Sequence, residues 1–77
     1  MRIQVLGTGC AKCKQLMANA EQAVRKMGLD VQVEKVSEIA EIMKFGVMMT
    51  PAIAIDGEVK SAGKVLSPQE IMGLVSP

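Results

Sequence analysis

The sequence lacks histidine, tryptophan and tyrosine, and Phe45 is its only aromatic residue. Without histidine, no imidazole is available to assist another catalytic group. Ring packing cannot specify the interior, so the core must be filled by aliphatic side chains and by the seven methionines, which adapt to irregular gaps. We therefore expect a soft aliphatic core to which Phe45 contributes one ring.

The chain also lacks an excess of charge and any long apolar run. Its formal net charge is +1, without the basic patch that nucleic-acid or anionic-membrane partners usually require. The apolar run at residues 3–6 is too short for a signal-peptide core or a membrane span. We expect a cytoplasmic protein without such partners. No repeat, low-complexity segment or linker is present, so residues 1–77 are expected to form one domain.

Two cysteines are present, in the pair Cys10-Ala11-Lys12-Cys13. The pair follows the strand-like run 3–6 and opens a helical stretch, so its first sulfur lies beside the unpaired N–H groups and positive dipole end of a helix. This position favours the thiolate, the form that attacks disulfides and binds soft metals. In a reducing compartment the pair is redox-active or metal-binding rather than a permanent staple.

The apolar spacing makes the two cysteines unequal. Gly28 is a suitable end for the helix that they open. One face of that helix is apolar and carries Cys13, Leu16, Met17, Ala20, Val24 and Met27. Cys13 therefore begins the buried stripe, whereas Cys10 lies one turn earlier, where nothing on the helix covers it. We expect Cys10 to be exposed and Cys13 to be covered.

A strand and a short helix are predicted next along the chain. Residues 30–36 begin with alternating apolar and polar side chains, which indicates a strand with one polar face. Ser37 is expected to cap a short helix that Lys44 and Gly46 close.

A hairpin is the strongest local prediction. Residues 52–55 are a short apolar run that indicates a buried strand. Asp56-Gly57 is typical of a two-residue hairpin turn, and residues 58–62 form the returning strand.

The last helix is marked by its start signals. Ser67 can cap it, Pro68 suits the first helical position and Glu70 can complete a capping box. Leu66 and Ile71 are placed as a hydrophobic staple. The expected order is strand, helix, strand, helix, strand, strand, helix. The helical crossover makes the first two strands parallel and the hairpin adds an antiparallel pair, which predicts an α/β fold with a mixed four-stranded sheet.

These motifs resemble the thioredoxin superfamily, most closely its small glutaredoxin-like members with a redox-active disulfide. The likeness covers nearly the whole chain. It is carried by Gly9 with the cysteine pair, residues 47–52 with Thr50-Pro51, the hairpin 55–57 and Gly63. The resemblance implies a minimal thioredoxin fold, βαβαββα, with a mixed four-stranded sheet flanked by three helices.

The resemblance also implies a site. Pro51 is expected to be cis and to face the cysteine pair, so that an extended substrate can pair with the backbone of Thr50. Supporting roles are expected for Gly9, Ala11, Lys12 and Gly63. No cofactor is implied beyond a Cys10–Cys13 disulfide. The implied partners are protein disulfides and a dithiol reductase, and a monomer acting in electron transport and cell redox homeostasis is expected.

Thiol–disulfide exchange is the function that these residues favour. The Cys10 thiolate would attack a target disulfide, and Cys13 would then attack the Cys10 sulfur and release the reduced target. Lys12 and Lys14 would add positive charge that lowers the pKa of Cys10.

Two alternatives stay open at this point. Two thiolates also suit Cu(I), and small copper and mercury carriers begin with a similar strand, cysteine pair and helix. Met48 and Met49 could then add thioether ligands. A structural zinc site is disfavoured because it wants four Cys or His ligands. The third possibility is a non-catalytic thioredoxin-like binding module. Thr50-Pro51 and the capped final helix favour exchange over these alternatives.

Overall fold

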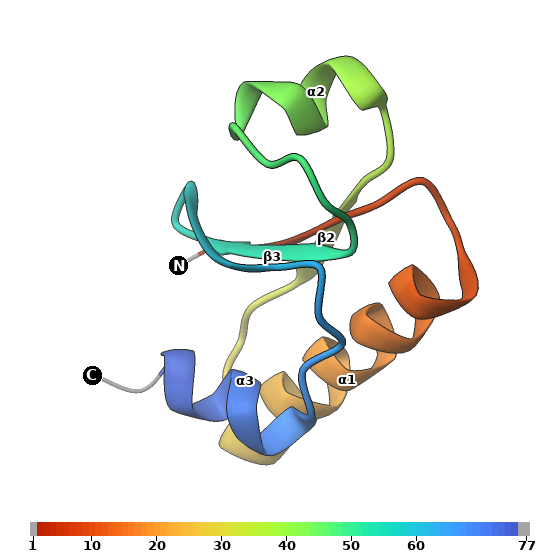
Figure 1. The fold of residues 1–77 in the computed structure, drawn as a ribbon. Coiled ribbons are helices and arrows are strands. Elements are labelled where there is room, and N and C mark those ends of the chain that lie inside the picture. Colours follow the sequence, from red (N-terminus) through yellow and green to blue (C-terminus); the bar gives the residue numbers. More distant parts are fainter. Residues whose placement is uncertain (1, 76–77) are drawn as a thin grey trace.

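The computed structural model describes residues 2–75, so Met1 and residues 76–77 of the predicted domain lie outside the described residues. The order of elements is the predicted one (Figure 1). They are β1 (Ile3–Leu6), α1 (Ala11–Met27), β2 (Val33–Val36), α2 (Ile39–Lys44), β3 (Ala52–Ile55), β4 (Glu58–Ala62) and α3 (Pro68–Val75).

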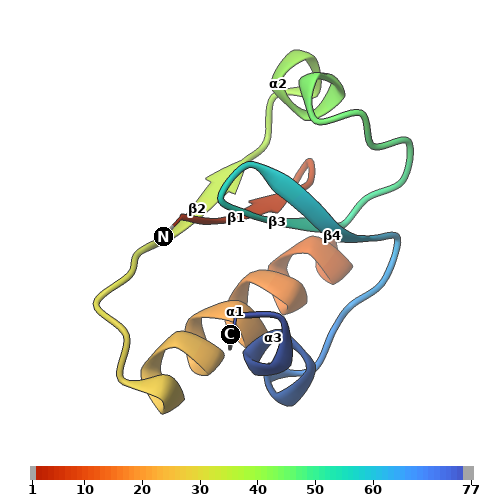
Figure 2. The same cartoon turned by 90° about the vertical axis from the view of Figure 1, so that its left-hand side faces the viewer.

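The four strands form one mixed sheet in the order β2-β1-β3-β4. β1 and β2 are parallel because α1 carries the chain back between them, whereas β1 with β3 and β3 with β4 are antiparallel. Asp56 and Gly57 both have positive φ in the tight turn between β3 and β4. Figures 1 and 2 show α1 and α3 side by side on one face of the sheet and α2 on the other. The predicted fold class is confirmed.

The core is divided by the sheet because side chains alternate along a strand. Ile3 and Val5 of β1 belong to the larger cluster under α1 and α3, together with Leu16 and Ile71. On the α2 side the cluster is small. Its buried members are Leu6, Ile42 and Ala52, with Val36, Phe45, Val47 and Val59 packed against them. Phe45 is thus a core residue, as predicted.

α1 has the predicted face and end. Its buried residues are Cys13, Leu16, Ala20, Ala23 and Val24, whereas Met17 and Met27 of the predicted face are only half-buried. Gly28 adopts the left-handed conformation, with φ of 67°, and its N–H donates to the carbonyl of Arg25. The N–H of Leu29 donates to the carbonyl of Val24, which completes a Schellman motif.

Two boundaries differ from the prediction. β2 begins at Val33 rather than at residue 30, because β1 pairs with it only from Ile3 opposite Val33 to Leu6 opposite Val36. Ser37 does not cap α2. The N-cap is Glu38, which makes no side-chain capping hydrogen bond.

The predicted capping box of α3 is present. The N–H of Glu70 donates to Oγ of Ser67 over 3.2 Å, and the N–H of Ser67 donates to Oε1 of Glu70 over 3.0 Å. The backbone and side chain of Ser67 both hold the pKa of Glu70 below its ordinary value, with a smaller contribution from the Lys64 charge. Leu66 and Ile71, the staple positions, are both buried.

This capping box predicts a pH-dependent stability. Because the pKa of Glu70 is lowered on folding, its carboxylate stabilises the fold above its unfolded pKa of about 4.3, and the contribution is lost as the pH falls through the folded pKa. We expect Glu70→Gln to lower the free energy of unfolding near neutral pH, and this deficit to shrink as acid is added. Urea unfolding at several pH values measures it. A deficit independent of pH would contradict the role given to Glu70.

Candidate redox site

The sheet register brings the two predicted halves of the site together. Leu6, the last residue of β1, lies opposite Ala52, the first residue of β3. Because these strands are antiparallel, the loop after Leu6 that leads to Cys10 runs beside the segment that ends at Pro51. The peptide bond between Thr50 and Pro51 is cis. Pro51 is buried, whereas Thr50 is exposed.

Gly63 joins this arrangement through the backbone. It follows β4 with φ of 81°, and its N–H donates to the carbonyl of Pro51 over 2.8 Å. A Cβ atom on Gly63 would come within 3.1 Å of the Met49 side chain. The structure therefore places Gly63 next to Pro51 and Met49.

Cys10 is the N-cap of α1, with its sulfur in the place that a serine or aspartate oxygen usually takes. Its Sγ accepts a hydrogen bond from the N–H of Cys13 over 3.3 Å. The N–H of Lys14 donates to the Cys10 carbonyl over 3.0 Å. Ala11 and Lys12 are exposed and form the first residues of the helix. Gly9, immediately before the cap, has φ of 94°, a conformation that favours glycine.

The two sulfurs differ in exposure as predicted. Cys10 is exposed, whereas Cys13 is only 5% exposed. Both are free thiols in this structure. Only Cys10 is therefore open to a bulky substrate.

Hydrogen bonds at the helix start lower the pKa of the Cys10 thiol. The largest cause is the hydrogen bond from the Cys13 side chain, followed by the backbone N–H of Cys13. Burial opposes the shift, and the backbone N–H groups of Lys12 and Cys10 add smaller contributions in the lowering direction. Lys12 thus acts through its amide, whereas the sequence predicts an effect of the Lys12 and Lys14 ammonium charges, which are not among these causes.

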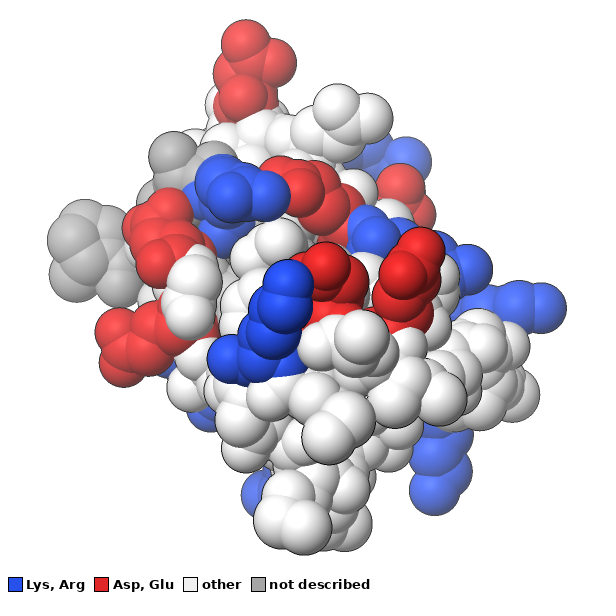
Figure 3. Space-filling view, turned by 90° about the horizontal axis from the view of Figure 1, so that it is seen from above, with Lys and Arg blue, Asp and Glu red and all other residues white. Residues whose placement is uncertain are grey.

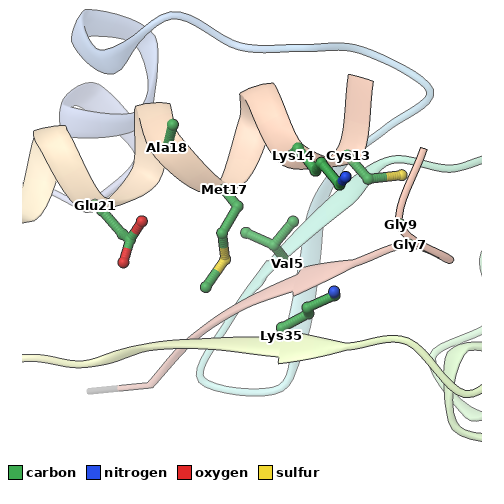
Figure 4. A pocket seen from close by; sticks show the side chains of 9 residues that line it. All are labelled: Val5, Gly7, Gly9, Cys13, Lys14, Met17, Ala18, Glu21 and Lys35. Atoms are coloured by element: carbon green, nitrogen blue, oxygen red, sulfur yellow. The ribbon is translucent and has the colours of Figure 1, made fainter. Parts of the chain in front are cut away.

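One further residue of the site is Gly7, which the sequence motifs do not indicate. Gly7 is buried, and its N–H donates to the carbonyl of Val36 at the end of β2 over 2.9 Å. Figure 4 shows the Cys13 sulfur directed toward Gly7 and Gly9. The only sequence signal for this role is a glycine that directly follows the first strand.

A cavity of about 220 Å³ lies beside Cys13, between α1 and the first two strands (Figure 4). Val5 and Met17 give it apolar walls, and Lys14, Glu21 and Lys35 are the charged residues that line it. The Cys13 thiol therefore borders a small, mostly apolar space.

Comparisons with known proteins agree with this geometry. Residues 1–76 match the family described as the thioredoxin domain. The chain belongs to the thioredoxin family. It is 43% identical over 76 residues to a thioredoxin of Methanothermobacter thermautotrophicus, covering 99% of both chains. It is 39% identical over 69 residues to a thioredoxin of Methanocaldococcus jannaschii, covering 90% of this chain and 79% of that relative.

Membership of the thioredoxin family confirms the resemblance and identifies the chain as an enzyme, a thiol–disulfide oxidoreductase. Among residues 2–75, no three His, Cys, Asp or Glu side chains are grouped to hold a metal ion. Within the same residues no helix has the length and apolar character needed to cross a membrane.

The hydrogen bonds to Cys10 predict the pH dependence of its alkylation. Because its pKa is lowered, the rate of carboxamidomethylation by iodoacetamide should reach half its maximum below pH of about 8.5, the ordinary value for cysteine. Cys13→Ala removes the largest cause, so the midpoint should move up toward that value. Cys10→Ser controls for modification elsewhere. The same midpoint in wild type and Cys13→Ala would contradict the role of the Cys13 thiol.

Proposed function

We propose that this thioredoxin-family protein reduces disulfides of protein substrates, with Cys10 as the attacking and Cys13 as the resolving thiol. The observation that carries the proposal is the position of the Cys10 sulfur. It is exposed, it caps α1, and it accepts the Cys13 N–H over 3.3 Å. A thiolate at this position is both stabilised and accessible, as the nucleophile of exchange must be.

The proposed reaction has two displacement steps. The Cys10 thiolate bonds to one sulfur of the substrate disulfide, and the other substrate sulfur leaves as a thiolate that takes up a proton. Cys13 then gives up its proton and bonds to the Cys10 sulfur, which releases the second substrate thiolate. The substrate has then gained two electrons, and the protein that supplied them is left oxidised, with a Cys10–Cys13 disulfide. A dithiol reductase returns them, so no cofactor beyond the cysteine pair is needed.

The support residues act on alignment in this proposal. The register of β3 with β1 supports a role for the exposed Thr50 segment, because the chain just before Ala52 runs beside the loop that follows Leu6 and carries Cys10. An extended substrate segment can pair with the backbone at Thr50 as an added strand. Gly9 and Ala11 leave space around Cys10, and Gly63 holds the carbonyl of Pro51.

An exposed apolar surface next to the cysteine loop supports a protein as substrate. Within residues 2–75, the large hydrophobic side chains that are exposed all belong to α2 and the loop after it. They are Ile39, Met43, Met48 and Met49, and Met48 is 97% exposed. Three of these four side chains, those of Ile39, Met43 and Met48, line a shallow hollow that also borders Thr8 and Thr50. Figure 3, which looks onto the α2 side, shows a broad area without charged side chains.

Methionines at such a surface suit varied apolar partners, because their side chains are flexible and polarizable. We further propose that the chain acts as a monomer and as one domain in the cytoplasm, within electron transport and cell redox homeostasis. The soft-metal carrier is the weaker alternative, because residues 1–76, with Thr50-Pro51 before β3 and the capped helix α3 after β4, match the thioredoxin domain.

Trapping the mixed disulfide tests the two cysteine roles. Wild type should catalyse reduction of a protein with an accessible interchain disulfide when a dithiol reductant is supplied. Cys13→Ser should accumulate a covalent adduct on Cys10, visible by non-reducing electrophoresis and mass spectrometry. Cys10→Ser should form no adduct and should return the rate to the uncatalysed one. An adduct on Cys13 in Cys10→Ser, with turnover retained, would reverse the assignment.

The apolar surface predicts a difference between large and small substrates. Met48→Asp should slow reduction of a protein disulfide by about tenfold, the effect of losing about 1.4 kcal/mol of contact energy. Reduction of a small aromatic disulfide should be unchanged, because it reaches Cys10 without covering this surface. Gln22→Asp, which adds the same charge on the exposed face of α1, is the matched control. Equal losses with both substrates would show that Met48 acts on the thiol instead of on docking.

A further inference from the structure

Gly7 differs from most glycines of this fold in what its missing side chain provides. It directly follows β1, at the start of the loop that leads to Cys10, and its φ is not positive, unlike that of Gly9 or Gly28. Its backbone therefore does not need glycine for conformational reasons. The reason must lie in the space that a side chain would occupy.

That space is taken by Cys13. A Cβ atom added to Gly7 would overlap Sγ of Cys13 and would lie 2.9 Å from its Cβ, closer than real Cβ contacts come. Five other glycines have no atom within 4 Å of such a Cβ, namely Gly9, Gly28, Gly46, Gly57 and Gly73. At Gly63 the nearest atom is the flexible end of Met49 at 3.1 Å. Only at Gly7 is the neighbour a functional sulfur.

Neither side of this contact can move away freely. Gly7 is tied to β2 through its hydrogen bond to the Val36 carbonyl, 2.9 Å long, and it continues the central strand β1. Cys13 is held by α1, whose next buried residue, Leu16, is fully enclosed in the main core. The Cys13 sulfur therefore lies against the backbone of Gly7, between β1 and α1.

We propose that Gly7 is a positioning residue whose missing side chain forms a slot for the Cys13 sulfur, and that this slot sets how the resolving thiol reaches Cys10. The inference rests on the proposed function for the resolving role of Cys13. Gly7 is buried and would act through Cys13.

The slot has consequences for both cysteines. A methyl group at residue 7 would push the Cys13 sulfur out of line for attack on Cys10, and a misplacement of about 1 Å can cost about 100-fold in rate. It would also disturb the Cys13 side-chain and N–H hydrogen bonds that hold down the pKa of Cys10.

A single kinetic experiment separates the two steps. An aromatic disulfide such as dithiobis(nitrobenzoate) releases one of its two thiols when Cys10 attacks it, while the other stays bonded to Cys10. This second thiol is released when Cys13 attacks the Cys10 sulfur. In Gly7→Ala the second release should be about tenfold to 100-fold slower than in wild type. The midpoint of the pH profile of the first release should move up. Gly73→Ala, a glycine with free space around it in α3, is the matched control and should behave as wild type.

The outcomes distinguish the slot from the proposed function. A wild type without a second release would refute the resolving role of Cys13, whatever Gly7 does. A normal second release and an unshifted pH profile in folded Gly7→Ala would refute the slot alone.

A stability cycle tests the contact without any chemistry. Gly7→Ala should lower the urea midpoint of unfolding, and in a Cys13→Ala background, where the overlapping sulfur is gone, at least half of that loss should disappear. If Gly7→Ala does not fold by itself, the double variant should. An equal loss in both backgrounds, or failure of both chains to fold while Cys13→Ala folds, would overturn the proposal.

Discussion

The hydrogen bonding of β1 on both of its edges is the constraint on which the rest of this structure depends. β1 pairs with β2 on one side and with β3 on the other, and all four of its residues are buried. Three parts of the site are therefore set by one short strand. Its end delivers the cysteine loop, its pairing with β3 brings Thr50-Pro51 alongside, and the end of β2 holds Gly7 through Val36. Because the strand is covered on both faces, none of these parts can shift independently.

At the start of α1, one arrangement satisfies both helix formation and reactivity. A helix needs acceptors for its first N–H groups, and a reactive thiol needs donors that stabilise its thiolate. Placing the Cys10 sulfur at the N-cap meets both needs, since the N–H of Cys13 donates to it. The same turn of helix directs Cys13 inward, where it is covered by the fold. The exposed and covered thiols of the family's chemistry thus follow from one turn of helix.

The cores on the two faces of the sheet differ in size, and this difference suits the proposed function. α1 and α3 enclose the larger core, whereas α2 covers a cluster of only three buried residues among those described. The apolar side chains that α2 and its following loop leave exposed lie near Thr8 and Thr50. Stability therefore comes mainly from one face, and the other is free to offer apolar surface to a partner.

The sequence by itself determined what depends on neighbours along the chain. The helical phase of Cys13 and Leu16, the left-handed end at Gly28, the Asp56-Gly57 turn and the Ser67–Glu70 box are all present as predicted. Each of these features depends on contacts between residues a few positions apart, so the local sequence contains all the residues that cause it.

Only the tertiary structure decided the start of β2, the failure of Ser37 as a cap and the contact between Gly7 and Cys13. β2 begins where β1 offers a partner, and α2 begins at Ile39 with Glu38, not Ser37, as its N-cap. Gly7 matters because α1 packs against the strand that precedes it, which places the Cys13 sulfur against the backbone of Gly7. Such steric limits arise between elements that meet only after packing, and local sequence patterns do not contain them.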